Sequence, residues 1–190
     1  MTCDACLHNT FTNPLPQIDA ASIGVGGDSA GGNLAAAVAL KARDAALQPA
    51  LAFQILVYPC NDPFMSGSSY TEFAQGYGLT TRAMKWFWEQ YLGAAQVSSA
   101  TPPPAYAAPM LAQSFGGLPP AVMVVAECDP LASDSGSYAA QLTAAGVEVV
   151  TRTFEGMNHG FITICAVTPR AHEALEWVAG EVKGVLLRRS

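Results

Sequence analysis

The segment Gly27 to Gly31, with the sequence GDSAG, contains the side chain best suited to covalent chemistry. It lies between a short apolar run, residues 22–25, and an alanine-rich run, residues 34–43, so a strand should turn directly into a helix at Ser29. Small neighbours permit such a turn, and the turn aims the amino end of the helix at the serine. Ser29 is therefore a candidate nucleophile, and the amide of Ala30 is a candidate oxyanion donor. The alternatives are a glycine-rich turn without chemistry and, less favoured because no Gly-Lys-Ser/Thr follows, a phosphate-binding loop.

A serine nucleophile needs a general base, and that base needs a carboxylate to orient it. Among the three histidines, His159 follows a β-like run, residues 147–154, and has glycines nearby that would let a loop carry the imidazole over a sheet. His8 lies in a polar, proline-punctuated segment, and His172 falls within a helical run. His159 is therefore the candidate base, although a lone loop histidine is more often a solvated surface residue.

The candidate acid follows the continuous apolar run at residues 121–126, which is typical of a strand covered on both faces. Asp129 lies where this strand should leave the sheet, and functional groups gather at the carboxyl ends of parallel strands. Glu127 is expected to belong to the strand end, Asp134 to start or cap the next helix, and Asp62 to follow a strand too early in the chain. Asp129 is the best candidate to orient His159.

The order Ser29, Asp129, His159, each after a separate strand, is that of the α/β-hydrolases. The chain resembles the hormone-sensitive-lipase-like esterases of that superfamily, in the branch with the GDSAG sequence. The resemblance runs from about Ile18 to the C-terminus, and the following segments carry it: residues 25–34, 57–59, 117–121, 126–131 and 155–161, with 69–72 and 86–92 between them. It implies a carboxylic-ester hydrolase that forms an acyl-enzyme on short- to medium-chain acyl esters and needs no metal or cofactor. It makes Ser29 the nucleophile, Asp129 the acid, His159 the base and Ala30 one oxyanion donor.

One feature of that family is missing before Gly26, namely the His-Gly-Gly-Gly-type loop whose amides complete the oxyanion hole. The family's early strands are missing too, and residues 1–17 form a divergent segment in which Pro14 and Pro16 would stop a helix. We therefore expect a truncated α/β-hydrolase fold that corresponds to the C-terminal portion of such an esterase. The serine strand would become a sheet edge, which favours a homo-oligomer. A second hypothesis is a catalytically impaired fragment that acts as an oligomeric binding or structural protein; a peptidase or amidase is a weaker third.

The rest of the chain predicts a single α/β domain over residues 1–190. Strands are expected at residues 22–26, 51–58, 121–126 and 147–154, and helices at 30–43, about 135–145 and 169–187. Right-handed crossovers would make a small, mostly parallel sheet with helices on both faces. Residues 61–118 are too many for a simple crossover and predict a partial helical cap. Its helix at 81–92 has an apolar face (Met84, Phe87, Trp88 and Tyr91) that would line an acyl pocket over Ser29, pack on the sheet, or do both.

Composition narrows the possible partners. The chain is 51% hydrophobic and 13% charged, with a net charge of −6 and no large basic cluster, which argues against nucleic-acid binding. No apolar run reaches the ~20 residues of a membrane span, and the N-terminus has no signal-peptide pattern, so a cytoplasmic protein acting on a small-molecule ester is expected. The five cysteines include Cys3 and Cys6, which we interpret as incidental rather than as a metal or redox site, and Cys128, expected to be a small buried thiol.

Overall fold

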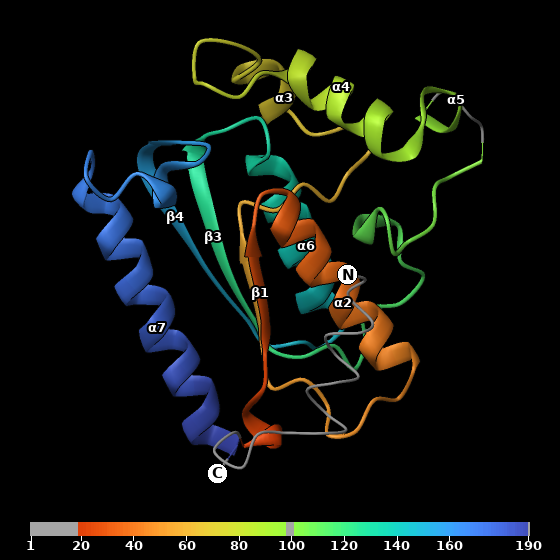
Figure 1. Cartoon of the computed structure of the whole chain (residues 1–190), viewed down its shortest axis with the longest axis vertical. Coiled ribbons are helices and arrows are strands. Elements are labelled where there is room, and N and C mark those ends of the chain that lie inside the picture. Colours follow the sequence, from red (N-terminus) through yellow and green to blue (C-terminus); the bar gives the residue numbers. More distant parts are fainter. Residues whose placement is uncertain (1–18, 98–100, 190) are drawn as a thin grey trace.

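A computed structural model describes residues 19–97 and 101–189. Its strands form one parallel sheet in the order β1-β2-β3-β4, with helices on both faces (Figure 1). This confirms the predicted fold class, and the sheet is parallel throughout. The elements in chain order are η1 (Ala20–Ser22), β1 (Val25–Asp28), α2 (Ala30–Asp44), β2 (Gln54–Val57), α3 (Ser69–Glu72), α4 (Thr81–Leu92), α5 (Ala94–Val97), η2 (Pro109–Leu111), β3 (Ala121–Cys128), α6 (Ala132–Ala144), β4 (Val149–Asn158), η3 (Phe161–Thr163) and α7 (Pro169–Arg189).

Two hydrophobic cores lie on opposite faces of the sheet. On one face α2 and α6 cover the strands, with Leu40, Leu56 and Met123 among the buried side chains. On the other face α7 packs against β3 and β4, where Val122, Val124, Phe154 and Val178 meet. Figure 1 shows α2 and α6 on one side of the strands and α7 on the other. The alanine-rich sequence of α2 allows this helix to lie close to the sheet, and nine of its residues are buried.

The first two strands are shorter than predicted, for local reasons. Asp19 accepts hydrogen bonds from the Ala21 amide at 3.0 Å and the Ser22 hydroxyl at 2.6 Å, so Ser22 joins the turn η1 rather than β1. Strand β2 pairs with β3 only from Gln54, whose amide donates to the carbonyl of Pro120 at 2.8 Å. Proline has no amide hydrogen with which to extend that ladder towards residue 51.

The other two strands are longer than predicted, and both extend towards the candidate site. Strand β3 continues to Cys128, and β4 continues to Asn158 after a register shift between Ala126 and Cys128. Gly156, at φ 70°, donates from its amide to the Glu127 carboxylate at 2.7 Å in this stretch. Helix α6 begins at Ala132, earlier than predicted, so Asp134 lies within its first turn instead of capping it.

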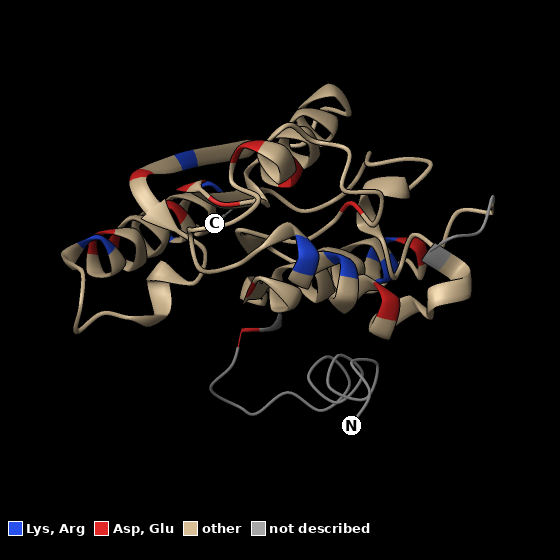
Figure 2. Ribbon diagram, turned by 90° about the horizontal axis from the view of Figure 1, so that it is seen from above, with Lys and Arg blue, Asp and Glu red and all other residues tan. Residues whose placement is uncertain are grey.

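The predicted cap segment, residues 61–118, contains α3, α4, α5 and η2. Helix α4 has the predicted bounds: the Thr80 hydroxyl accepts from the Ala83 amide at 3.1 Å, and Gly93 ends the helix at φ 85°. Figure 1 shows α3, α4 and α5 above the carboxyl ends of the strands. Within the described residues, no helix combines the length and hydrophobicity needed to span a bilayer. Figure 2 shows the Lys and Arg residues scattered among Asp and Glu along the described helices.

Among the residues that the structure describes, β1 pairs with β2 alone and so forms one edge of the sheet. The amides of Val25 and Ser29 donate to carbonyls of residues 53 and 57 at 3.1 and 2.9 Å, so the odd-numbered residues of β1 face β2. In a strand, successive residues alternate in direction, and the backbone groups of Gly26 therefore face away from β2. Gly26 is exposed. An open strand edge of this kind is a template for pairing with another chain.

We predict that the free edge of β1 pairs with a second copy of the chain. Sedimentation velocity should show a dimer or larger species as protein concentration rises, because exposed backbone groups gain hydrogen bonds on pairing. Amide exchange measured by NMR provides the local readout. Exchange at Gly26 should slow at high concentration, whereas Gly27, which already faces β2, should change little. A protein that stays monomeric, with fast exchange at Gly26 at every concentration, would contradict the prediction.

Candidate active site

Ser29 occupies the sharp turn between β1 and α2. Its backbone has φ 55° and ψ −119°, a conformation that L-residues rarely adopt. The turn is held by hydrogen bonds from the Ser29 amide to the Val57 carbonyl at 2.9 Å and from the Asn33 amide to the Ser29 carbonyl at 3.1 Å. A serine at the start of a helix usually caps that helix with its hydroxyl, but Ser29 makes no such bond. The hydroxyl is directed elsewhere.

Glycine is required around this turn because strand and helix approach very closely. A Cβ atom on Gly27 would lie 2.3 Å from the carbonyl oxygen of Gly31, which is a backbone atom and cannot move aside easily. At Gly32, a Cβ atom would lie 2.9 Å from Cβ of Pro59. Gly31 itself has ordinary space, with its nearest contact 3.9 Å away. Gly27 therefore sets the distance between β1 and α2, and Gly32 lets α2 lie close to the chain that follows β2.

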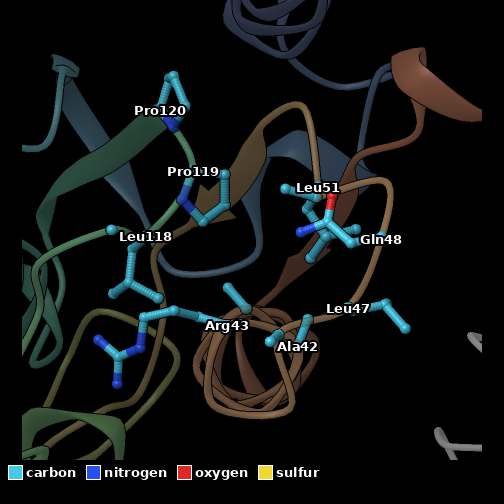
Figure 3. A pocket seen from close by; sticks show the side chains of 12 residues that line it. Ala42, Arg43, Leu47, Gln48, Leu51, Leu118, Pro119 and Pro120 are labelled. Atoms are coloured by element: carbon cyan, nitrogen blue, oxygen red, sulfur yellow. The ribbon is translucent and has the colours of Figure 1, made fainter.

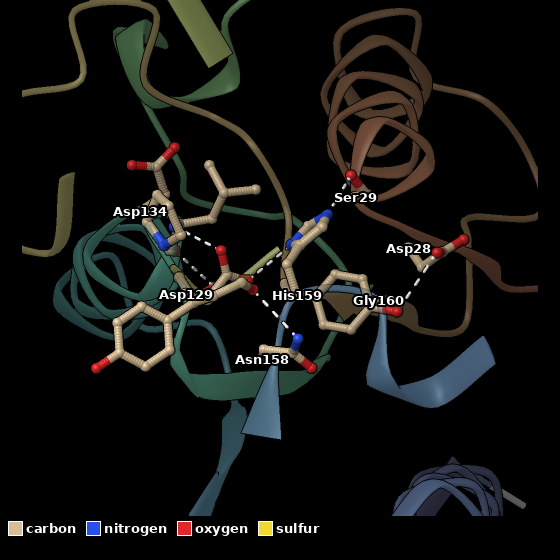
Figure 4. Close-up of polar contacts among 12 residues, drawn as sticks. Asp28, Ser29, Asp129, Asp134, Asn158, His159 and Gly160 are labelled. Carbon is tan, nitrogen blue, oxygen red and sulfur yellow. Dashed lines mark hydrogen bonds and ion pairs between the residues drawn. The ribbon is translucent and has the colours of Figure 1, made fainter. Parts of the chain in front are cut away.

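The three candidate residues predicted from the sequence meet at the carboxyl ends of β1, β3 and β4. His159 Nε2 lies 2.8 Å from Ser29 Oγ, and His159 Nδ1 lies 2.7 Å from Asp129 Oδ2 (Figure 4). Asp129 is fully buried, and its second oxygen accepts a hydrogen bond from the Leu131 amide at 2.9 Å. The Asp129 carboxylate can only accept a hydrogen bond from His159 Nδ1, so the neutral imidazole carries its proton on Nδ1. Its Nε2 atom is then free to accept a hydrogen bond from the Ser29 hydroxyl. This arrangement can deprotonate the serine during attack on a carbonyl carbon.

Tyr58, at the end of β2, is a site residue that the sequence reasoning did not assign. Its ring centroid lies 4.6 Å from that of His159, and its side chain is 1% exposed. The Tyr58 backbone has φ 35°, a strained value for an aromatic residue. Burial and the nearby charge of Asp28 raise the pKa of the Tyr58 hydroxyl, which therefore stays protonated and faces the Asp28 carboxylate at 3.5 Å. The available signal was a Tyr-Pro pair that ends a buried strand.

Ala30, the candidate oxyanion donor, is the first residue of α2. The first amides of a helix have no carbonyl partner within the helix, and the helix dipole makes this end attractive to negative charge. The amide of Ala30 directly follows the Ser29 carbonyl, so it is placed to donate to an oxygen that develops charge after attack by Ser29 Oγ.

An apolar cavity of about 270 Å³ opens beside Ala30. Helix α2 contributes Asn33 and Leu34 to its wall. Helix α4 lines it with the apolar face predicted from the sequence, Met84, Phe87, Trp88 and Tyr91. Met84 and Trp88 are buried in a small core with Tyr70 and Leu131, whereas Phe87 and Tyr91 are about half exposed. All four residues line the cavity, and Met84 and Trp88 also pack in this small core rather than directly on the sheet.

A second cavity, of about 280 Å³, lies at the other end of the sheet. It is lined by residues that precede β2 and β3 and by the last turns of α2, including Arg43, Leu51 and Leu118 (Figure 3). The Arg43 guanidinium donates to the carbonyls of Ser114 and Gly116 at 2.8 and 3.1 Å. Because this cavity lies at the amino ends of the strands, far from Ser29, it takes no part in the candidate active site.

The remaining candidates from the sequence have simple structural roles or lie outside the described residues. Cys3, Cys6 and His8 belong to the latter group. His172 is exposed on α7, as predicted for a helix-surface residue. Cys128 is partly exposed at the end of β3, so the expectation of a buried thiol was wrong; the strand runs two residues further than predicted and places Cys128 at its exposed carboxyl end. No group of metal-ligating side chains occurs within residues 19–97 and 101–189.

Comparison with known proteins gives a consistent set of matches. A family model described as alpha/beta hydrolase fold matches residues 3–163. The chain is 42% identical over 145 residues to carboxylic ester hydrolase LipN of Mycobacterium tuberculosis, covering 75% of this chain and 38% of LipN. It is 34% identical over 163 residues to an ethyl acetate hydrolase of Pseudomonas putida, covering 85% of this chain and 49% of that protein. The chain thus spans half or less of the length of these relatives.

Solved structures resemble the chain as well. A bacterial heroin esterase superposes with a TM-score of 0.86 at 33% identity, covering 95% of this chain and 57% of that one. A thermostable esterase from Pseudomonas putida superposes with a TM-score of 0.78 at 37% identity, covering 90% of this chain and 55% of that one. At these identities the likeness extends to sequence as well as to fold.

The close approach at the serine turn predicts an unequal response to two glycine substitutions. Gly27→Ala should lower the free energy of unfolding by about 3 kcal/mol or more, because its Cβ would overlap the Gly31 backbone. Gly136→Ala is the matched control, since Gly136 is exposed within α6 and a Cβ there would meet no atom within 4 Å. That substitution should raise stability by roughly 0.5–1 kcal/mol. Urea unfolding measures both; equal midpoints for Gly27→Ala and the unchanged protein would refute the packing argument.

Proposed function

Because the chain belongs to the alpha/beta hydrolase fold family, we propose that it hydrolyses carboxylic esters, with Ser29 as the nucleophile. The observation that supports this most directly is the continuous chain of contacts from Ser29 Oγ through His159 to Asp129, at 2.8 and 2.7 Å. The names of the relatives, among them a carboxylic ester hydrolase and an ethyl acetate hydrolase, point to the same reaction class. The proposed activity is that of the residues present in this chain, which spans half or less of the length of these relatives.

The proposed reaction has two halves that use the same groups. His159 removes the proton from Ser29 Oγ as the oxygen attacks the ester carbonyl, and the Ala30 amide donates to the resulting oxyanion. The buried carboxylate of Asp129, which accepts from Nδ1, stabilises the imidazolium. His159 then protonates the departing alcohol and leaves an acyl group on Ser29. Water, deprotonated by His159, attacks this acyl-enzyme and releases the carboxylic acid.

The proposed substrates are short- to medium-chain acyl esters. The cavity beside Ala30 has almost entirely apolar walls and a volume of about 270 Å³. An apolar cavity of about 150 Å³ holds a benzene molecule, so this one has room for an acyl chain of roughly six carbons. Cys60 lines the cavity as well, and burial raises the pKa of its thiol to about 12, so it contributes a neutral wall.

A second candidate function is that of a catalytically impaired protein that binds ligands or other copies of itself. The observation that favours it is the unpaired edge of β1 in the described part of the chain, which can pair with another copy of the chain. The two functions differ in whether Ser29 supports turnover. Both are compatible with self-association through the edge of β1.

Turnover of p-nitrophenyl acetate and butyrate by the purified protein tests the proposal. Ser29→Ala should abolish it, with a loss of at least about a thousandfold, because the attacking oxygen is gone. Ser137→Ala is the control, since Ser137 is an exposed serine on α6, away from the site. Equal background rates for the unchanged protein and Ser29→Ala would favour the impaired-protein function instead.

The proposed acyl cavity makes a separate prediction about chain length. Leu34→Trp should fill part of the cavity and lower kcat/KM for p-nitrophenyl hexanoate by about tenfold, while acetate turnover stays within about twofold. Leu175→Trp provides the control, because Leu175 is a similarly exposed leucine, 47% against 50%, on α7. If Leu34→Trp slows acetate and hexanoate equally, the cavity does not hold the acyl chain.

A further inference from the structure

Asp134 is a buried carboxylate outside the Ser29–His159–Asp129 arrangement. It lies in the first turn of α6 and is 2% exposed. Its Oδ2 atom accepts three hydrogen bonds, from the amides of Asn61 and Asp62 at 3.0 Å each and from the Tyr70 hydroxyl at 3.1 Å. All three donors belong to the segment that follows β2 and leads into α3. A single oxygen atom thus connects the start of the cap segment to α6.

Ser69 adds further hydrogen bonds between the same two segments. Its hydroxyl donates to the Pro130 carbonyl at 2.5 Å and accepts from the Ser133 amide at 3.0 Å, while its own amide donates to Ser133 Oγ at 3.1 Å. The chains approach closely here, because a Cβ atom on Gly67 would lie 2.1 Å from Cβ of Ser133. We call the four residues Ser69, Tyr70, Ser133 and Asp134 the latch.

The latch holds the turn that begins at Asp129. Asp129 bonds to this turn through its carboxylate, which accepts from the Leu131 amide at 2.9 Å, and through its carbonyl, which accepts from the Ala132 amide at 3.0 Å. The carbonyl of Pro130, the residue between Asp129 and Leu131, accepts a hydrogen bond from the Ser69 hydroxyl. Movement of residues 130–134 would therefore carry the Asp129 carboxylate with it. The contact at risk is the 2.7 Å separation between Asp129 Oδ2 and His159 Nδ1.

We propose that Asp134 is a positioning residue that, through the latch, keeps Asp129 within hydrogen-bond distance of His159. The effect on catalysis rests on the proposed esterase function, whereas the effect on the Asp129–His159 contact does not. Asp134 forms no hydrogen bond with Ser29 or His159. Its influence on the site therefore passes through the turn at residues 130–134. In this proposal the start of the cap segment and the turn at residues 130–134 move together.

The surroundings of Asp134 make its charge state sensitive to pH. The groups that face it are Asp62, Tyr70 and Cys60, and none of the ion pairs among the described residues includes Asp134. Burial raises the pKa of Asp134 to about 7, with a smaller contribution from the charge of Asp62 and against the lowering effect of its hydrogen bonds. Folding therefore favours the protonated form.

The raised pKa of Asp134 determines how the stability of the fold changes with pH. The folded chain binds a proton at Asp134 that the unfolded chain, with an ordinary pKa of 3.8, has already released. The associated stabilisation is present in full below about pH 4 and is lost as the pH rises through about 7. Asp134→Asn keeps an accepting oxygen but cannot ionise. Between about pH 5 and pH 8, the melting temperature should therefore fall further in the unchanged protein than in Asp134→Asn.

The test compares Asp134→Ala, Asp134→Asn and Tyr70→Phe with the unchanged protein. Tyr138→Phe is the control, because Tyr138 is a buried tyrosine of α6 whose hydroxyl has no hydrogen-bond partner among the described residues. Two readouts are used: the downfield NMR resonance of the His159 Nδ1 proton, and kcat and KM for p-nitrophenyl butyrate. In Asp134→Ala the resonance should broaden or disappear and kcat should fall on the order of tenfold to a hundredfold, with KM nearly unchanged. Asp134→Asn should retain both.

Each outcome decides the proposal. A folded Asp134→Ala variant that keeps the resonance and kcat overturns it, even if its melting temperature falls, because Asp134 would then serve stability alone. If Asp134→Ala does not fold, Tyr70→Phe decides: a weakened resonance supports the latch, and behaviour equal to Tyr138→Phe overturns it. If the unchanged protein has no esterase activity, the proposed function fails while the NMR resonance still tests the positioning role.

Discussion

The close contact between β1 and α2 is the constraint on which the site depends. Strand and helix meet with no room for a side chain at Gly27, and the backbone between them is forced into φ 55° at Ser29. This strain prevents the serine from capping its own helix and turns Oγ towards His159. The alanine-rich face of α2 serves the same end, because small buried side chains let the helix lie against the sheet. Local strain is thus maintained by packing on both sides of it.

The parallel sheet brings the side chains of the site together at the carboxyl ends of its strands. Each strand ends at the same edge and contributes one side chain there: β1 leads to Ser29, β2 to Tyr58, β3 to Asp129 and β4 to His159. Because β2 lies between the serine and acid strands, the imidazole must reach back from β4 across the intervening strands. The extended end of β4 and the left-handed Gly160, at φ 82°, allow this reach. Tyr58, which directly follows β2, packs against the imidazole with its ring centroid 4.6 Å away.

The cap segment is joined to this edge by polar contacts as well as by apolar packing. Met84 and Trp88 of α4 bury apolar surface in a small core that includes Leu131, two residues after Asp129. The hydrogen bonds of Asp134 and Ser69 connect the same regions without an ion pair. Buried polar groups of this kind are costly unless fully satisfied, so they specify one arrangement of the segments more strongly than apolar contact alone. The wall of the cavity and the turn that follows the acid therefore share contacts.

The sequence alone determined the fold class, the strand–turn–helix at Ser29, the bounds of α4 and the identity of Ser29, Asp129 and His159 as candidates. These features are local: glycine spacing, apolar runs and capping residues act over a few positions, and strand order brings their ends to one edge. Only the tertiary structure decided that Tyr58 packs on the imidazole, that β3 and β4 extend to Cys128 and Asn158, and that Asp134 accepts hydrogen bonds from the segment that follows β2. These depend on contacts between segments tens of residues apart. No local pattern encodes which distant donor a buried oxygen will meet, because burial and packing of the whole chain decide it.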